Sequence, residues 1–185
     1  DIGLGATSIA AALMHDVVED TDITVQDIEK MFNPKIAQLV EGLTKIAKVK
    51  TDQEISMQAE NFRKMLLTLN DDVRVILIKI ADRLHNMQTM GSMADYKQAK
   101  IASETLYIYA PLAHRLGLYN IKTQLEDLGL KYTEPEIYNE IVSKIKETKE
   151  EQDEYIKYIS EILSKSLEAE DIKFTIKGRP KSIYS

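Results

Sequence analysis

The chain is 185 residues long, lacks cysteine and tryptophan, and carries a net charge of −6. The lack of cysteine excludes a disulfide scaffold, a thiolate zinc site and a cysteine nucleophile. Hydrophobic residues make up 44% and charged residues 29% of the chain, which is typical of a globular domain, and no apolar run approaches the ~20 residues that span a bilayer. The 7 glycines and 4 prolines are too few for the many turns of a sandwich or barrel, so a mostly helical fold is expected.

Apolar periodicity and capping residues predict helices along most of the chain. A first helix is expected over residues 6–20, and Thr24 is expected to cap a short second helix that ends at Asn33. Pro34 fits the first turn of a third helix, which continues over residues 35–47.

A polar loop over residues 48–53 and another helix over 54–69 are expected next. Residues 73–80 form a β-branched apolar run that is compatible with a buried strand or a buried helix. A helix is favoured, because the run continues without a turn signal, one of the two preceding aspartates can cap it, and Gly91 can stop it.

Two more helices, separated by Gly117, are predicted over residues 97–116 and 118–131, and Pro111 should kink the first of them. A polar pattern over residues 135–168 indicates one long helix or two.

The chain divides into three regions. Residues 1–133 are predicted to be an all-α globule, and residues 134–170, with 11 acidic and 5 basic side chains, an acidic helical connector. Residues 172–177 are the one convincing strand, so residues 171–185 are expected to begin a second domain that the chain does not complete. A nucleic-acid-binding domain would be basic, and residues 1–133, with 18 acidic and 15 basic side chains, are not.

The densest group of potential metal ligands is His15-Asp16, followed by Glu19-Asp20. On a continuous helix His15 would stack over Glu19, and Asp16 over Asp20. Such groups on an otherwise apolar helix cost free energy unless something pairs with them, and a divalent metal would pair with the first two. Imidazole and carboxylate together suit zinc, manganese or iron better than calcium. The alternative is a helix end that frays into solvent, although the helix dipole disfavours acids there.

Asp82, His85 and Asn86 form a second cluster, spaced so that all three lie on one helical face. Asp82 follows an apolar run, is expected to be buried, and needs a metal or an arginine as its partner. A metal is favoured for Asp82 if the first helix supplies His15 and Asp16. A satisfied core position is favoured for His85.

Two further features have simpler interpretations. His114 lies in an apolar helix next to the expected kink and is most simply structural. A moderately basic stretch surrounds one loop and is either a solvated face or a contact for anionic phosphates; it comprises Lys45, Lys48, Lys50, Arg63 and Lys64.

These two clusters resemble the hydrolase domain of the RelA/SpoT family, bacterial enzymes that make and destroy the guanosine alarmones ppGpp and pppGpp. Residues 58–66, 109–117 and 178–185 match the same family, so the resemblance covers essentially the whole chain. Synthetase-only members have lost the His-Asp and Glu-Asp residues of the hydrolase site. This sequence keeps both pairs and therefore resembles the hydrolase-competent branch.

The resemblance implies an all-α fold with a multi-helix HD-type phosphohydrolase domain over residues 1–133 that lacks its N-terminal part. A helical linker over 134–170 comes next, and 171–185 would hold the first strand of an incomplete α/β synthetase domain. The parent protein would be a long bifunctional enzyme of the bacterial cytoplasm.

The implied reaction is the Mn²⁺-dependent removal of the 3′-pyrophosphate from ppGpp or pppGpp, which leaves GDP or GTP and pyrophosphate. Four side chains hold the metal in the family. Three of them correspond to His15, Asp16 and Asp82, and the fourth, an upstream histidine, would precede Asp1.

The remaining site residues are assigned by the same resemblance. Glu19 and Asp20 would orient or deprotonate the attacking water. Asn86 would hydrogen-bond the ribose and Thr89 would face the same pocket. Lys50 would neutralise pyrophosphate oxygens.

The implied partners are guanosine tetraphosphate or pentaphosphate and the synthetase domain of the same chain, with the ribosome a candidate for the full-length parent only and no membrane. Two alternatives stay open. The first is a catalytically inactive HD domain that regulates the neighbouring synthetase, which the intact Glu19-Asp20 pair argues against. The second is an HD phosphohydrolase for another nucleotide, which the length of the match argues against.

Overall fold

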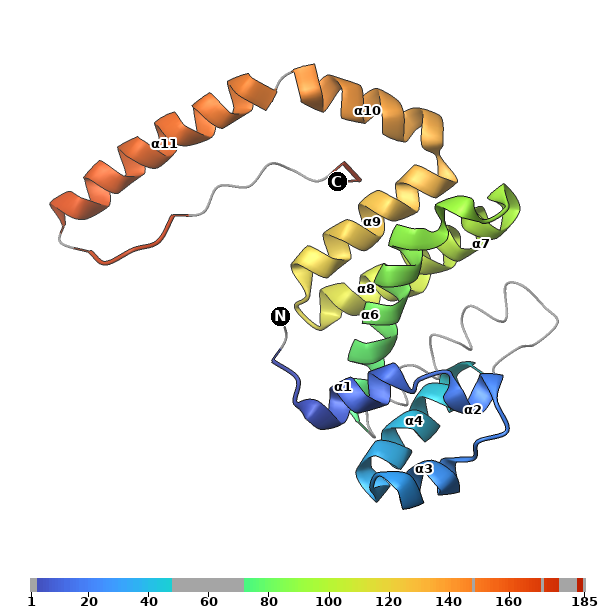
Figure 1. Cartoon of the computed structure of the whole chain (residues 1–185). Helices are drawn as coiled ribbons and strands as arrows, with labels where there is room; N and C mark the ends of the chain where they lie inside the picture. Colours follow the sequence, from blue (N-terminus) through green and yellow to red (C-terminus); the bar gives the residue numbers. More distant parts are fainter. Residues whose placement is uncertain (1–2, 48–71, 148, 171, 177–182, 185) are drawn as a thin grey trace.

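The computed structural model describes residues 3–47, 72–147, 149–170, 172–176 and 183–184. Every regular element in these residues is a helix (Figure 1). In chain order they are α1 (Ala6–Leu13), α2 (Val17–Asp20), α3 (Val25–Met31), α4 (Pro34–Ala47), α6 (Val73–Thr89), the 3₁₀ helix η1 (Met90–Ser92), α7 (Asp95–Glu104), the π-helical turn η2 (Thr105–Tyr109), α8 (Ala110–Arg115), α9 (Tyr119–Thr133), α10 (Pro135–Glu147) and α11 (Lys149–Ala169). The predicted all-α fold class is confirmed for this part of the chain.

The C-terminal end differs from the prediction. Residues 172–176 form no strand, because a strand needs a neighbour to complete its hydrogen bonds and the described residues provide none. The predicted loop over 48–53 and helix over 54–69 lie outside the described residues. Among the helices that are described, none combines the length and apolar character needed to cross a membrane.

Side-chain caps set the starts of α3 and α6. Thr24 and Asp27 form a reciprocal capping box, in which the Asp27 amide donates to Thr24 Oγ1 over 3.2 Å and the Thr24 amide donates to Asp27 Oδ2 over 3.1 Å. At α6, Asp72 Oδ1 accepts the Arg74 amide over 3.1 Å. Both caps confirm the predicted starts, and each satisfies amides that have no partner within the helix.

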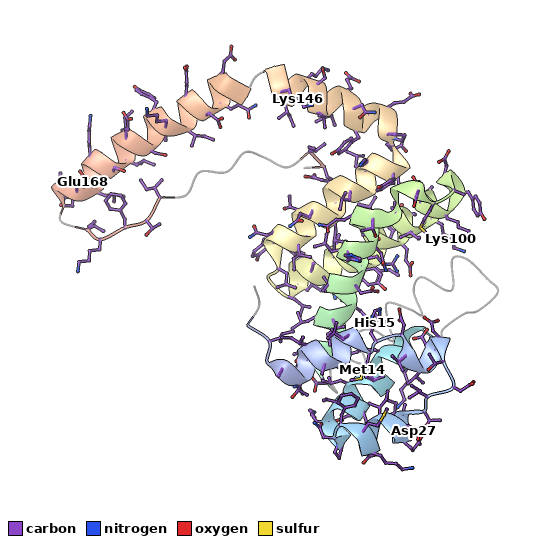
Figure 2. All side chains as sticks on the ribbon, in the orientation of Figure 1. Met14, His15, Asp27, Lys100, Lys146 and Glu168 are labelled. Carbon is purple, nitrogen blue, oxygen red and sulfur yellow. The ribbon has the colours of Figure 1, made fainter. Side chains whose placement is uncertain are left out.

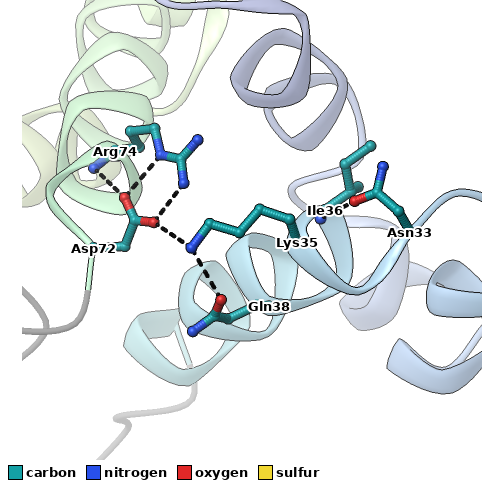
Figure 3. Close-up of polar contacts among 6 residues, drawn as sticks. All are labelled: Asn33, Lys35, Ile36, Gln38, Asp72 and Arg74. Carbon is teal, nitrogen blue, oxygen red and sulfur yellow. Dashed lines mark hydrogen bonds and ion pairs between the residues drawn. The ribbon is translucent and has the colours of Figure 1, made fainter.

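The Asp72 carboxylate also joins α4 to α6 (Figure 3). Arg74 donates from Nε to Oδ1 over 2.9 Å and from Nη2 to Oδ2 over 2.7 Å, and Lys35 Nζ lies 3.1 Å from Oδ2. The hydrogen bond from Arg74, assisted by Lys35, lowers the pKa of Asp72. The first turns of α4 and α6 are therefore held together by one charged cluster.

Helix α6 is shared by two separate hydrophobic cores. One contains Val75 and Ile78 of α6 together with side chains of α1, α3 and α4. The other contains Ile76, Ile80 and Met87 together with side chains of α7, η2, α8 and α9. Figure 1 shows the two groups of helices on either end of α6, with α10 and α11 extending away from them.

The predicted helix over 6–20 is interrupted. Helix α1 ends at Leu13, residues 14–16 form a turn, and α2 begins at Val17. In a continuous helix the Ala12 carbonyl would accept the amide of Asp16, but His15 Nδ1 lies 2.9 Å from that oxygen. A side chain that competes for a backbone group in this way breaks the helical ladder.

The distortion predicted at Pro111 takes the form of the π-helical turn η2. Pro111 has no amide hydrogen to donate, so the turn before it widens. The break predicted at Gly117 is confirmed, because its φ of 73° is left-handed. The Leu118 amide reaches the Ala113 carbonyl over 2.8 Å, and the Gly117 amide the His114 carbonyl over 3.0 Å, which is a Schellman ending.

Candidate metal centre

Three side chains from two elements meet where the turn after α1 approaches α6. His15 Nε2 lies 2.8 Å from Asp16 Oδ2 and 3.4 Å from Asp82 Oδ1. The side chain of Asp16 is 49% exposed, and those of His15 and Asp82 are 24% and 26% exposed. Figure 2 shows His15 where α1 ends, close to α6. The structure thus brings together the three predicted ligands.

The other nitrogen of the His15 ring fixes its orientation. Nδ1 lies 2.9 Å from the Ala12 carbonyl oxygen, which can only accept, so Nδ1 carries a proton. In a neutral ring, Nε2 then presents a lone pair to the carboxylates of Asp16 and Asp82. Three electron-pair donors that face one another repel unless a proton or a cation lies among them. Metal-binding histidines are commonly oriented by a backbone carbonyl in this way.

The donor set fits a divalent cation. With metal–ligand bonds of about 2.0–2.2 Å, neighbouring ligand atoms lie roughly 3.0–3.5 Å apart, which is close to the two distances from His15 Nε2. The described residues contain no group of three or more His, Cys, Asp and Glu side chains already arranged to hold a metal. A small opening of the His15–Asp16 contact would make room for the cation.

The face of α6 that carries Asp82 is less buried than predicted. Asn86 Nδ2 donates to Asp82 Oδ1 over 3.2 Å, so these two side chains do share a face. His85 is exposed, and its predicted core position is wrong. The reason is that the core formed with α1, α3 and α4 takes only Val75 and Ile78 from α6, so the same side is uncovered one turn later.

Three other predicted residues have different outcomes. Thr89 Oγ1 donates to the His85 carbonyl over 3.0 Å, so only its lone pairs are open to a ligand. His114 is exposed, and its ring meets Tyr119 edge-on at 5.5 Å; its structural role stays a prediction. Lys50 lies outside the described residues.

Glu19 and Asp20 lie on α2 and are exposed. The predicted stacking of His15 over Glu19 on one continuous helix is wrong, because the chain turns at residues 14–16. Neither carboxylate has a hydrogen bond or ion pair with any residue that the structure describes. Both still come directly after the His-Asp pair within one short helix, with their oxygens free to accept protons.

Arg83, beside Asp82, is a residue that the sequence reasoning missed. Its Nη2 donates to Glu104 Oε2 over 3.0 Å and to the Tyr109 hydroxyl over 3.2 Å, and its guanidinium lies 4.2 Å from the Tyr109 ring centroid. Burial raises the pKa of Tyr109, which keeps its phenol neutral. These contacts fix α6 against α7 and η2, and so set the direction of Asp82. The residues adjacent to Arg83 in the sequence do not indicate these contacts, because its partners are 21 and 26 residues away.

Comparison with known proteins identifies the family. A model of the HD domain matches residues 1–119. The chain belongs to the HD domain family. An HD domain of the hydrolase type implies a divalent metal. The imidazole and carboxylates around His15 are a donor set of the kind that binds such metals.

Curated relatives match over the whole chain. The guanosine-3′,5′-bis(diphosphate) 3′-pyrophosphohydrolase of Aquifex aeolicus is 46% identical over 186 residues, which cover 100% of this chain and 26% of that protein. The bifunctional (p)ppGpp synthase/hydrolase SpoT of Escherichia coli strain K12 is 45% identical over 185 residues, with 100% and 26% covered. The probable guanosine-3′,5′-bis(diphosphate) 3′-pyrophosphohydrolase of Synechocystis is 45% identical over 185 residues, which cover 100% of this chain and 24% of that protein.

The resemblance predicted from the motifs is confirmed by these relatives. The chain spans about a quarter of the length of the curated relatives it matches. The substrate and the chemistry proposed for this chain therefore concern the HD domain alone.

Proposed function

We propose that this HD domain removes the 3′-pyrophosphate from ppGpp or pppGpp, leaving GDP or GTP and pyrophosphate, with Mn²⁺ as its metal. The observation that carries the proposal is the convergence of His15, Asp16 and Asp82. The names of the relatives supply the substrate class.

His15, Asp16 and Asp82 would hold the metal, together with an upstream histidine that is not part of this chain. When bound, such a metal lowers the pKa of a bound water and offsets charge on the phosphate. The Ala12 carbonyl keeps His15 Nδ1 protonated, which leaves Nε2 available as a ligand atom. Asn86 keeps the Asp82 carboxylate oriented by its hydrogen bond to Oδ1.

The exposed carboxylates of α2 supply the base. Glu19 and Asp20 have no competing partner in the described part of the chain, so either can accept a proton from the attacking water and pass it to solvent. Asn86 retains its amide oxygen for a ribose hydroxyl. Lys50 and its neighbours would neutralise pyrophosphate oxygens.

The proposed division of the chain is based on the same relatives. Residues 1–133 would form the hydrolase domain, 134–170 a linker that includes α10 and α11, and 171–185 the entry to a synthetase domain. A protein of this kind would work in the bacterial cytoplasm.

The test is release of pyrophosphate, measured as phosphate after treatment with pyrophosphatase, from ppGpp, dGTP and a cyclic dinucleotide in the presence of Mn²⁺. It should use this chain and a version extended upstream to carry the fourth ligand. Of the three substrates, we expect only ppGpp to release pyrophosphate. The extended version should release far more of it than this chain does. Activity on dGTP or the dinucleotide would indicate another HD phosphohydrolase. No activity on any of them, with the metal bound, would indicate a regulatory domain.

A further inference from the structure

The face of α6 that points to α1, α3 and α4 continues beyond the hydrophobic core. Val75 and Ile78 pack in that core and define the direction of the face. Asp82 lies two helical turns beyond Val75 and points the same way, as its 3.4 Å contact with His15 confirms. His85 lies two turns beyond Ile78 and is exposed. Asp82 and His85 therefore form the uncovered part of one continuous face.

The polar side chains along this uncovered part of α6 differ in whether they have partners. Asn86 Nδ2 donates to Asp82 Oδ1 over 3.2 Å, and Thr89 Oγ1 donates its proton to the His85 carbonyl over 3.0 Å. Neighbouring Arg83 is engaged by partners on α7 and η2. The imidazole of His85 has no hydrogen bond or ion pair with any residue that the structure describes. An imidazole always carries at least one N–H, so His85 offers this face a donor that no described residue engages.

The distance between His85 and Asp82 suits an anion that binds the metal. The Cβ atoms of residues three apart on a helix lie about 5–6 Å from each other. On the N-terminal side of Asp82 the face is closed by buried Val75 and Ile78. An anion that touches the metal and extends along α6 must therefore extend toward His85. A pyrophosphate has this form, because one phosphate can bind the metal while the second continues beyond it, and its oxygens accept N–H groups.

We propose that His85 is a substrate-binding residue, which donates a hydrogen bond from its imidazole to an oxygen of the pyrophosphate group at the candidate metal centre. Asn86, the next residue, is left to contact the ribose. This proposal rests on the proposed function for the position of the metal and for the pyrophosphate group. It holds for any nucleotide that carries this group, so it does not depend on the guanine base.

Calorimetric titration with inorganic pyrophosphate, at a fixed excess of Mn²⁺, tests the contact on the version extended upstream. His85→Ala should weaken pyrophosphate binding by about tenfold or more, because a hydrogen bond to a charged group is lost. Its affinity for Mn²⁺ without pyrophosphate should equal that of the wild type. Unchanged pyrophosphate affinity would overturn the proposal, as would a parallel loss of Mn²⁺ affinity or a wild type that binds no pyrophosphate.

Two further variants separate the hydrogen bond from general effects of the substitution. His114→Ala makes the same change at an exposed position on α8 and should alter neither pyrophosphate nor Mn²⁺ affinity. His85→Gln retains a side-chain N–H and should bind pyrophosphate more tightly than His85→Ala. All three proteins should keep the helical circular dichroism of the wild type, because both histidines are exposed.

Labelling with diethylpyrocarbonate gives a second measurement, because the three histidines of the chain have different expected responses. Mn²⁺ alone should protect His15, Mn²⁺ with pyrophosphate should protect His85 as well, and neither should protect His114. Protection of His85 by Mn²⁺ alone would make it a metal ligand and overturn the proposal. So would full labelling of His85 at saturating pyrophosphate.

The failure of this proposal is distinct from the failure of the proposed function. Release of pyrophosphate from ppGpp by the wild type tests the reaction itself. Pyrophosphate binding that depends on His85, without any such release, would support the contact and remove the proposed reaction. Release from ppGpp together with equal pyrophosphate affinity in His85→Ala would support the reaction and overturn the contact.

Discussion

The two halves of the candidate metal centre are built very differently. Asp82 stands on α6, a helix of 17 residues that belongs to both cores and is clamped by Arg83 to α7 and η2. His15 and Asp16 stand on a turn that leads into the four-residue helix α2, which has no buried residue. The α6 half is preorganised, whereas the other half is shaped by local side-chain hydrogen bonds, from His15 to the Ala12 carbonyl and from Thr21 to the Val17 carbonyl. We infer that α6 fixes where the metal binds and that the turn adjusts to it.

The largest expected effect is the removal of the ligand on the rigid half. Asp82→Ala, in the version extended upstream, should lower Mn²⁺ affinity by ~10²-fold or more and abolish pyrophosphate release from ppGpp. Its helical circular dichroism should be unchanged, because Asp82 packs in neither core. Hydrolysis at a near wild-type rate would remove Asp82 from the metal centre.

On the flexible half, loss of a carboxylate of α2 should lower the rate of hydrolysis and leave Mn²⁺ binding unchanged. Glu19→Gln should retain Mn²⁺ affinity and lose about 10²–10⁴ in rate, which is typical for the loss of a general base. The comparison of kcat with calorimetric affinity checks this. A collapse of metal affinity would make Glu19 a ligand.

Loosening the clamp tests whether rigidity of α6 matters. Arg83→Met leaves Glu104 and Tyr109 without their donor and should cost about 1–3 kcal/mol in the free energy of unfolding, measured in urea. It should also weaken Mn²⁺ binding, although Arg83 is not a ligand. Arg83→Lys keeps the positive charge but lacks the planar guanidinium. Its free energy of unfolding and its Mn²⁺ affinity should lie between those of the wild type and Arg83→Met. Equal metal affinity in all three proteins would show that the clamp serves stability alone.

The smallest effect should be seen by hydrogen exchange. Addition of Mn²⁺ should slow the amides of residues 14–20 and leave those of α6 unchanged, because only the turn is ordered by the metal. The Asp82→Ala variant is the control and should show no slowing. Equal slowing in α6 would mean that both halves adjust.

The sequence predicted those features that depend on neighbours in the chain. The capping box of Thr24 and Asp27 and the left-handed Gly117 were predictable because each is set by a few adjacent residues. The helical state of residues 73–80 was predicted correctly from the absence of a turn signal, although the apolar run itself is compatible with a buried strand or a buried helix.

The features that were missed depend on competition or on distance. The helix break at residues 14–16 arises because His15 Nδ1 competes with the Asp16 amide for the Ala12 carbonyl. The pattern of residue types does not indicate which of the two groups binds that carbonyl. The clamp around Arg83 joins residues more than twenty positions apart. In the candidate site, the residue types and spacing predicted the ligands. They did not predict the contacts that orient those ligands.

Because α6 lies in both cores, the two groups of helices cannot melt one after the other. Unfolding the α1–α4 side uncovers Val75 and Ile78, and unfolding the α7–α9 side uncovers Ile76 and Ile80 on the same turns. Each loss withdraws the support on which the other group depends, so heating should give a single calorimetric transition for both. Cleavage within the two cores should then follow their common unfolding, because neither core opens without the other.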